Sequence, residues 1–219
     1  MTPPTVAVLG GTGHQGRGIA RRLARAGHRV IVGSRDAGRA AAAIAGWPTE
    51  PGAISAADYN GATSAADVVV LGIPFDAADA LLAQVHDSFR NGALVIDVMV
   101  PIAFVQGGPT LADLAEGSAA EHVRARLPPH VRLAVAFKTI PAQLLNEIDR
   151  PADCDEFVCG DSTEARAGAS TLVGAVKGLR AVDVGPLSRA RAIEHLTLLA
   201  IAINRRQKIH DARYRVVGL

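Results

Sequence analysis

Short apolar runs alternate with segments of helical spacing along most of this chain of 219 residues. The runs Val6 to Leu9, Val68 to Ile73 and Ala93 to Val100 are almost continuously apolar, which is typical of strands buried on both faces of a parallel sheet. Between the last two, Asp76 to Phe89 has apolar residues three and four apart, as in an amphipathic helix. Strands that alternate with helices predict an α/β fold with a Rossmann-type doubly wound parallel sheet.

The same reading predicts the remaining elements. Further strands are expected at 28–33, 52–55, 131–137, 154–159 and 179–184, and helices at 15–26, 39–44, 118–127, 142–147, 162–177 and 189–207. Ile102 to Gly117, with Gly107-Gly-Pro109 at its middle, is expected to be a long loop, and such loops are usually functional or mobile. We expect a Rossmann domain over residues 1–140 and a small C-terminal α/β domain over 141–219 that packs against it and closes a substrate cleft.

A cluster of glycines separates the first strand from the first helix. The stretch Gly11-Thr12-Gly13-His14-Gln15-Gly16 fits G-x-G-x-x-G, whose glycines let the backbone turn and approach a pyrophosphate. The helix that follows offers backbone N–H groups and the positive end of its dipole to phosphates. Glycine turns also join strands to helices with nothing bound, so the motif alone does not establish a nucleotide site.

The end of the second strand bears on which dinucleotide would bind. NAD-binding folds carry Asp or Glu at this strand tip to bind the ribose 2′-hydroxyl, whereas this chain has Ser34-Arg35 there. Arg35 is suited to a 2′-phosphate through charge-assisted hydrogen bonds, and Arg39, one helical turn further on, adds a second cation. Both arginines are equally compatible with a solvated surface. Asp36 is able to reach a bare ribose, but we interpret it as the cap of the next helix. NADP(H) is therefore predicted over NAD(H).

Composition excludes several classes of function. The 23 Lys and Arg against 21 Asp and Glu give a net charge of +2, which offers no reason to expect nucleic acid or an anionic membrane as partner. The most apolar segment, Leu196 to Ile203, is too short to span a bilayer and is expected to be a buried helix. Met1-Thr-Pro-Pro4 lacks the basic and apolar parts of a signal peptide, so we expect a cytoplasmic protein.

Side chains with metal-binding or nucleophilic chemistry are few and scattered. Cys154 and Cys159 stand five residues apart, which points them to opposite faces of a strand, and we interpret both as small core residues. His195 lies on a helix with a mostly apolar face, and we expect it to be a hydrogen-bonded core residue. No His, Cys, Asp and Glu have the spacing of metal ligands, so no metal is predicted.

Ligands of doubly wound sheets bind at the carboxyl ends of the strands. That rule places the glycine turn on one rim with Ser34-Arg35, Ile73-Pro74-Phe75, Met99-Val-Pro101 and Lys138-Thr139. This convergence strengthens the interpretation of the turn as part of a nucleotide site.

Several of these stretches form a familiar series. The motifs, in chain order, are Gly10-Gly-Thr-Gly-His-Gln-Gly-Arg-Gly18, Val32-Gly-Ser-Arg35, Ile73-Pro-Phe75, Lys138-Thr-Ile-Pro-Ala142, Val158-Cys-Gly-Asp161 and Asp183-Val-Gly-Pro-Leu-Ser188. Together they resemble the F420H2:NADP+ oxidoreductases, and the likeness covers nearly the whole chain. The resemblance implies hydride transfer between NADP(H) and the 5-deazaflavin coenzyme F420, in a homodimer.

The resemblance also implies a role for individual residues. Thr12 to Gln15 would surround the pyrophosphate, while Ser34, Arg35 and Arg39 would hold the 2′-phosphate. Ile73, Pro74 and Phe75 would border the nicotinamide. The deazaflavin would stack from the side of Lys138, Thr139 and Ile140.

One position departs from the family pattern. Archaeal members have His-Thr-Ile-Pro-Ala where this chain has Lys138-Thr-Ile-Pro-Ala142. A lysine here is suited to polarise or position the second substrate, and it is equally compatible with a surface lysine or a different acceptor. Two other functions therefore stay open, namely an NADPH-dependent reductase of a carbonyl, imine or alkene in a biosynthetic pathway, and a non-catalytic NADP(H) sensor.

Overall fold

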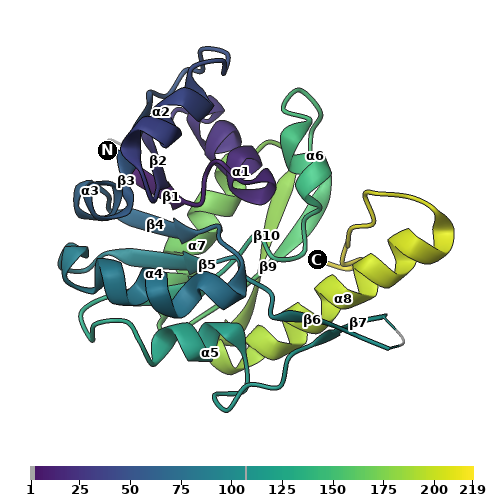
Figure 1. Ribbon diagram of the computed structural model, residues 1–219. Coiled ribbons are helices and arrows are strands. Elements are labelled where there is room, and N and C mark those ends of the chain that lie inside the picture. Colours follow the sequence, from purple (N-terminus) through teal and green to yellow (C-terminus); the bar gives the residue numbers. More distant parts are fainter. Residues whose placement is uncertain (1–2, 107) are drawn as a thin grey trace.

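The computed structural model describes residues 3–106 and 108–219. Met1 and Thr2, from the N-terminal stretch expected to lack a signal peptide, and Gly107, from the expected loop, lie outside the described residues. One sheet of eight strands, in the order β10-β9-β8-β5-β4-β1-β2-β3, carries helices on both faces (Figure 1). Its strands are β1 Val6–Leu9, β2 Val30–Ser34, β3 Ile54–Asp58, β4 Val68–Leu71, β5 Leu94–Asp97, β8 Arg132–Val135, β9 Cys154–Gly160 and β10 Leu179–Pro186. The helices are α1 His14–Arg25, α2 Ala37–Ile44, α3 Tyr59–Ala65, α4 Ala78–Val85, α5 Ala119–Arg124, α6 Ala142–Asn146, α7 Thr163–Ala175 and α8 Ala190–Gln207, with short 3-10 turns at Phe75–Ala77, His86–Ser88 and Leu187–Arg189.

The central strands are buried on both faces, as their apolar runs predict. In β1, Val6 and Val8 belong to the core under α1, α2, α6 and α7, while Ala7 and Leu9 belong to the core under α3, α4 and α5. All four side chains are fully buried. Because successive residues of a strand point to opposite faces, an unbroken apolar run is what a two-sided core requires, and the predicted Rossmann-type α/β fold is confirmed.

Two strands run against the expected direction. β9 pairs with β8 antiparallel, and β10 then pairs parallel to β9, so the prediction of a parallel sheet throughout was wrong at this edge. A parallel neighbour needs a connection that crosses back over the sheet. The only helix between β8 and β9 is the five-residue α6, which packs beside α1 rather than making that crossing.

The expected loop at Ile102 to Gly117 is partly a hairpin, so that prediction was wrong for its first half. β6 (Ile102–Val105) pairs antiparallel with β7 (Gly108–Leu111), with Ile102 opposite Leu111. Each strand has only four residues, and Gly108 and Pro109 of β7 are residue types typical of turns, so the sequence did not indicate the strands. The hairpin packs along α8 at the side of the molecule (Figure 1).

The last helix is less buried than its sequence predicts. Of the apolar stretch Leu196 to Ile203 only Ala200 is buried, and Leu199 is 50% exposed. His195 is also exposed, so its assignment as a core histidine was wrong. The outer face of α8 points away from the sheet (Figure 1), whereas Glu194, its neighbour, is fully buried.

The two cysteines and the cap of α5 are as the sequence predicted. Cys154 and Cys159 are buried, unpaired and in different core clusters. Ser118 caps α5 by accepting from the Glu121 N–H at 3.2 Å. In the described residues no helix is long and apolar enough to cross a membrane, and no three His, Cys, Asp or Glu side chains are grouped to hold a metal ion.

Candidate functional site

The glycine turn is most crowded at Gly10 and Gly16. A Cβ atom on Gly10 would lie 2.4 Å from the Gly72 carbonyl oxygen, and one on Gly16 would lie 2.5 Å from the Gly10 carbonyl oxygen. Gly10 also has a φ of 81°, which side chains disfavour. Gly13 is the N-cap of α1, and no side chain caps the helix. The first backbone N–H groups of α1 are thus left for an anion.

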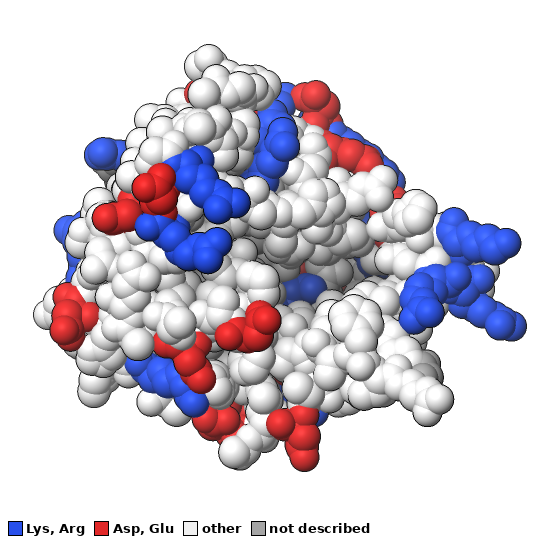
Figure 2. All heavy atoms as spheres, viewed as in Figure 1, with Lys and Arg blue, Asp and Glu red and all other residues white. Residues whose placement is uncertain are grey.

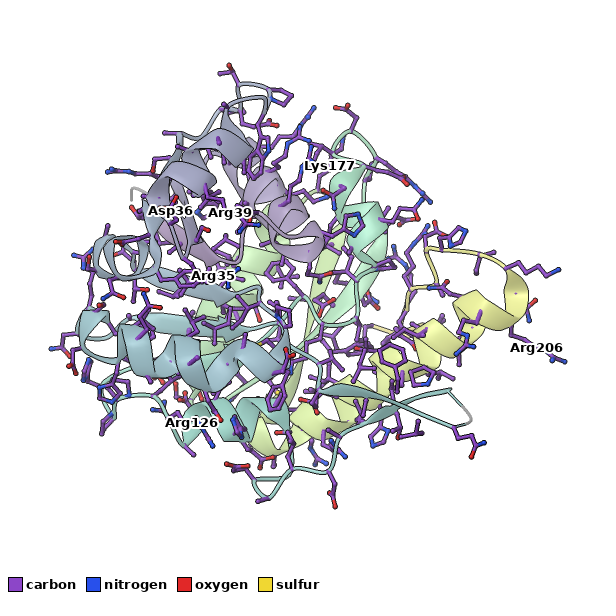
Figure 3. The ribbon with its side chains drawn as sticks, viewed as in Figure 1. Arg35, Asp36, Arg39, Arg126, Lys177 and Arg206 are labelled. Atoms are coloured by element: carbon purple, nitrogen blue, oxygen red, sulfur yellow. The ribbon has the colours of Figure 1, made fainter. Side chains whose placement is uncertain are left out.

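The end of β2 presents cations, as predicted. Ser34 is buried, whereas Arg35 and Arg39 are exposed, and Figure 3 shows both arginines at the same end of the sheet. The Asp36 carboxylate accepts from the Arg39 N–H at 2.7 Å, so Asp36 caps α2 as expected. The tip of β2 itself carries Ser34 and Arg35 rather than a carboxylate, which favours a 2′-phosphate over a bare ribose.

A cavity of about 440 Å³ opens beside these arginines. Its lining includes Arg35, Tyr59, Pro74 and Gln84. Burial raises the pKa of Tyr59 against the opposing effect of Arg35 and Arg39, so the phenol is neutral and lies close to both cations. Sequence reasoning missed Tyr59 and Gln84, because their positions after β3 and within α4 follow no motif.

A second cavity of about 370 Å³ lies at the carboxyl ends of β1, β4 and β5. It is lined by Gly13, His14, Gln15, Gly72, Ile73, Pro74, Phe75, Val98, Met99, Val100, Ile102, Lys138 and Thr197. The predicted residues from the glycine turn, from 73–75 and at Lys138 therefore meet in one place. The hollow near the centre of Figure 2 shows where the cavity opens between α1 and α8. The contributions of Ile102 and Thr197 were not foreseen, since they come from the hairpin and the last helix.

The wall opposite the glycine turn is the backbone turn 137–140. Phe137 has a φ of 59°, and three side chains from separate elements hold this turn. Gln15 Nε2 donates to the Phe137 carbonyl at 2.7 Å, and Thr197 Oγ1 donates to the Lys138 carbonyl at 3.1 Å. The buried Glu156 carboxylate accepts from the Lys138 N–H at 2.9 Å and from the Thr139 hydroxyl at 2.9 Å.

Glu156 binds this turn through hydrogen bonds alone, since it forms no ion pair with any residue that the structure describes. Burial raises the pKa of Glu156 to about 7, although the hydrogen bonds from Thr139, Lys138 and Ile140 oppose the shift. The wall of the pocket is thus tied to a carboxyl group that titrates near neutral pH.

The Lys138 side chain turns away from the cavity into an ion cluster. Its Nζ lies 2.8 Å from Asp97 Oδ2 and 3.0 Å from Glu194 Oε1, and it donates to the Met99 carbonyl at 2.5 Å. All three side chains are fully buried. Burial acts to lower the pKa of Lys138, but the two carboxylates outweigh it and raise the pKa above its ordinary value. The ammonium is therefore charged, and it donates to the Met99 carbonyl and to Glu194 while forming an ion pair with Asp97.

Glu194 connects the cluster to a further element. Its Oε1 also accepts from the Ala119 N–H at the start of α5, at 3.0 Å. Burial raises the pKa of Glu194, and the Lys138 ammonium opposes that shift. No sequence signal identified this carboxylate, because it precedes an apolar helical stretch.

A third cavity of about 250 Å³ continues from the second along α8. The two share Gln15, Lys138 and Thr197. The third cavity also takes in Thr139, Ile140, Pro141, Ala142, Ala200, Ile201, Asn204, His210 and Ala212. Since the first two cavities share Ile73 and Pro74, one groove runs from Arg35 to His210. Among the predicted residues, Gly11, Thr12, Gly16, Ser34 and Arg39 stand beside this groove rather than in its lining.

A doubly wound sheet, an uncapped helix after a crowded glycine turn, and a groove along the strand ends define a Rossmann-type dinucleotide-binding protein. Residues 5–101 match the family model described as NADP oxidoreductase coenzyme F420-dependent. The chain is 41% identical to the F420-dependent NADP reductase of Methanothermobacter thermautotrophicus, over 98% of this chain and 95% of that one. It is 33% identical to the enzyme of that name from Methanocaldococcus jannaschii, over 98% of each. The chain belongs to the F420-dependent NADP reductase family, as the sequence motifs predicted.

A solved structure has the same architecture over the full length. The crystal structure of a candidate F420-dependent NADP reductase from Arthrobacter sp. FB24 superposes with a TM-score of 0.82 at 26% identity, over 98% of this chain and 100% of that one. The overall architecture is therefore shared with that protein over nearly the full length of both chains.

Proposed function

We propose that this protein transfers hydride between NADP(H) and coenzyme F420. The observation that carries the proposal is the continuous groove, which joins the cations at the end of β2, the glycine turn and the 137–140 wall. Membership of the F420-dependent NADP reductase family supports the same pair of substrates.

NADP(H) fits the half of the groove that starts at Arg35. Arg35, Arg39 and Ser34 would hold the 2′-phosphate, and the backbone from Gly11 to Gly16, including Thr12, Gly13, His14 and Gln15, would hold the pyrophosphate. Ile73, Pro74 and Phe75 would border the nicotinamide. When bound, the dinucleotide supplies a nicotinamide carbon that gives or accepts hydride.

F420 fits the other half, against Lys138, Thr139 and Ile140. Hydride transfer between stacked rings depends on positioning more than on acid–base groups. The Lys138 ammonium is fully buried against Asp97, Glu194 and the Met99 carbonyl. We therefore assign Lys138 to holding this wall of the pocket in place, without a direct hydrogen bond from its ammonium to the deazaflavin ring.

We further propose a homodimer located in the cytoplasm. Exposed apolar side chains on the hairpin and on α8 support the dimer, since Phe104 is 85% exposed and Leu199 is 50% exposed. The location is supported by the two substrates, which are both coenzymes of cell metabolism.

A single assay tests the reaction. The purified protein is mixed with NADPH and F420, and the visible absorbance band of the deazaflavin is followed. We expect bleaching that depends on both substrates. NADPH binding without bleaching would overturn the proposal and favour a carbonyl, imine or alkene reductase, or a sensor.

A further inference from the structure

The third cavity follows one face of α8 towards its C-terminal end. Thr197, Ala200, Ile201 and Asn204 line it, with the i, i+3, i+4, i+7 spacing of a single helical face. Beyond Asn204, the chain turns back, and His210 and Ala212 close the far end of the cavity. A ligand that lies against the 137–140 wall is thus able to continue along α8 and leave at the end of that helix.

Basic side chains gather at this exit. Arg205, Arg206 and Lys208 are exposed, and within the described residues none of the three forms an ion pair. Neighbouring cations differ in this respect, because Arg150 and Arg213 share Asp211, and Arg215 pairs with Asp153. Figure 2 shows blue side chains at the end of α8 with no red among them.

The three cations do not point the same way. Lys208 comes four residues after Asn204 and donates its backbone N–H to the Asn204 carbonyl, so it stands at the end of the cavity-lining face. Arg205 comes four residues after Ile201, on the flank of that face. Arg206 is two residues from Asn204, which on a helix of 3.6 residues per turn is roughly the opposite side. Figure 3 shows Arg206 pointing outward from the molecule.

We infer that this end of the groove is a subsite for the anionic tail of the second substrate, with Lys208 as its main cation and Arg205 and His210 beside it. The inference rests on the proposed function, since F420 carries a phosphate and glutamate carboxylates at the end remote from its ring. The dipole of α8 favours cations at its last turn, and this effect is the same for Arg205 and Arg206. The position of the groove is different, because Lys208 stands at its end whereas Arg206 lies on the other side of the helix.

The test compares F420 with the same ribityl deazaflavin lacking the phosphate and glutamates. The readout is the ratio of kcat/KM for the two substrates, with NADPH saturating. We expect the wild-type protein to prefer F420. Lys208→Asn should reduce that preference about two- to fivefold, as for loss of one exposed ion pair. Asparagine suits this site because Lys208 has a left-handed φ of 54°. Added salt should reduce the preference in the same direction.

Arg206→Ala is the matched control, since it removes an equal charge from the other side of the same helix turn. It should leave the ratio at the wild-type value. A third substrate that keeps the phosphate but lacks the glutamates shows which anion Lys208 recognises.

Two results would overturn the subsite. One is equal kcat/KM for the tailed and tail-less substrates in the wild-type protein, and the other is an equal change of the ratio in Lys208→Asn and Arg206→Ala. In both, the deazaflavin is still reduced and the proposed function stands. Failure to reduce either deazaflavin would instead overturn the proposed function, and the subsite with it.

Discussion

Gln15 donates a hydrogen bond from Nε2 to the carbonyl oxygen of Phe137 over 2.7 Å. The donor stands in the first turn of α1, directly after the glycine turn, and the acceptor begins the opposite wall of the central cavity. One side chain thus joins the two halves of the groove. A residue that the sequence assigns to pyrophosphate binding also sets the spacing between the two proposed substrates.

Replacing Gln15 should therefore affect both substrates. In Gln15→Leu the Phe137 carbonyl loses its donor, so we expect kcat/KM to fall about tenfold for F420 as well as for NADPH. Steady-state kinetics with each substrate varied in turn measures the two losses. Gln143→Leu is the control, because Gln143 is exposed on α6. A loss confined to NADPH would contradict the coupling.

Arg35→Ala tests the choice of dinucleotide. Removal of a charge-assisted contact to a 2′-phosphate should weaken NADPH binding at least about tenfold and leave NADH binding almost unchanged. Fluorescence titration of both cofactors measures this. Arg29→Ala, at the opposite end of the same strand and also exposed, should change neither. Equal weakening for NADPH and NADH would show that Arg35 does not recognise the phosphate.

The raised pKa of Glu156 should make the protein less stable as the pH rises towards 7. Its pKa is raised by burial to about 7 in the folded protein, above the value near 4.5 of an exposed glutamate. Between these values the folded state holds more protons than the unfolded state, so the free energy of unfolding decreases as pH rises through this window. The full contribution is on the order of 3 kcal/mol.

Glu156→Gln should remove that dependence. The amide oxygen still accepts from the Lys138 N–H, and the amide nitrogen is able to donate to the Thr139 hydroxyl. Urea unfolding at pH 5 and pH 8 should show wild type losing stability relative to the variant at the higher pH. Parallel pH profiles for the two proteins would mean that Glu156 does not titrate in this range.

Lys138 should be a strong determinant of stability. Lys138→Met removes the cation nearest to the buried carboxylates of Asp97 and Glu194, which typically costs about 3–5 kcal/mol. Thermal or urea unfolding measures the loss. Lys177→Met is the matched control, since Lys177 is exposed at the end of α7 (Figure 3). A stability equal to that of the control would contradict the structural importance of the cluster.

Lys138→His asks whether the family residue is interchangeable with lysine. A histidine at this position should preserve reduction of F420, because the backbone of the 137–140 turn, rather than the ammonium, borders the cavity. Turnover of F420 by this variant is the measurement. Folded protein without F420 turnover would show that the ammonium itself serves the reaction.

Local patterns in the sequence were sufficient for most of the fold. The apolar run of β1 predicted a two-sided core, and Asp36 and Ser118 were correctly identified as helix caps. Direction and pairing at the sheet edge were not predictable, because the antiparallel placement of β9 depends on how α6 packs against α1. Two four-residue strands around turn residues gave the hairpin no periodicity long enough to recognise.

Part of the candidate site was likewise predictable from local sequence, and part depended on the fold. Backbone motifs located the glycine turn, Arg35, Ile73-Pro74-Phe75 and the 137–140 turn. The ion cluster was hidden, since Asp97 ends an apolar strand and Glu194 opens an apolar helical stretch, far from Lys138 in the chain. Only the fold brings these charges together, and this is why a lysine expected to face the substrate instead lies beneath the pocket.

The cluster is close to electrically balanced. Arg191 Nη1 lies 3.8 Å from Glu194 Oε2, so the two carboxyl groups of Asp97 and Glu194 face two cations, Lys138 and Arg191. The oxidised nicotinamide ring is a cation and the reduced ring is neutral, so only an unbalanced charge beneath the cavity would favour one form strongly. The reduction potential of the bound nicotinamide couple would therefore be set by the groups that border the ring rather than by this buried cluster.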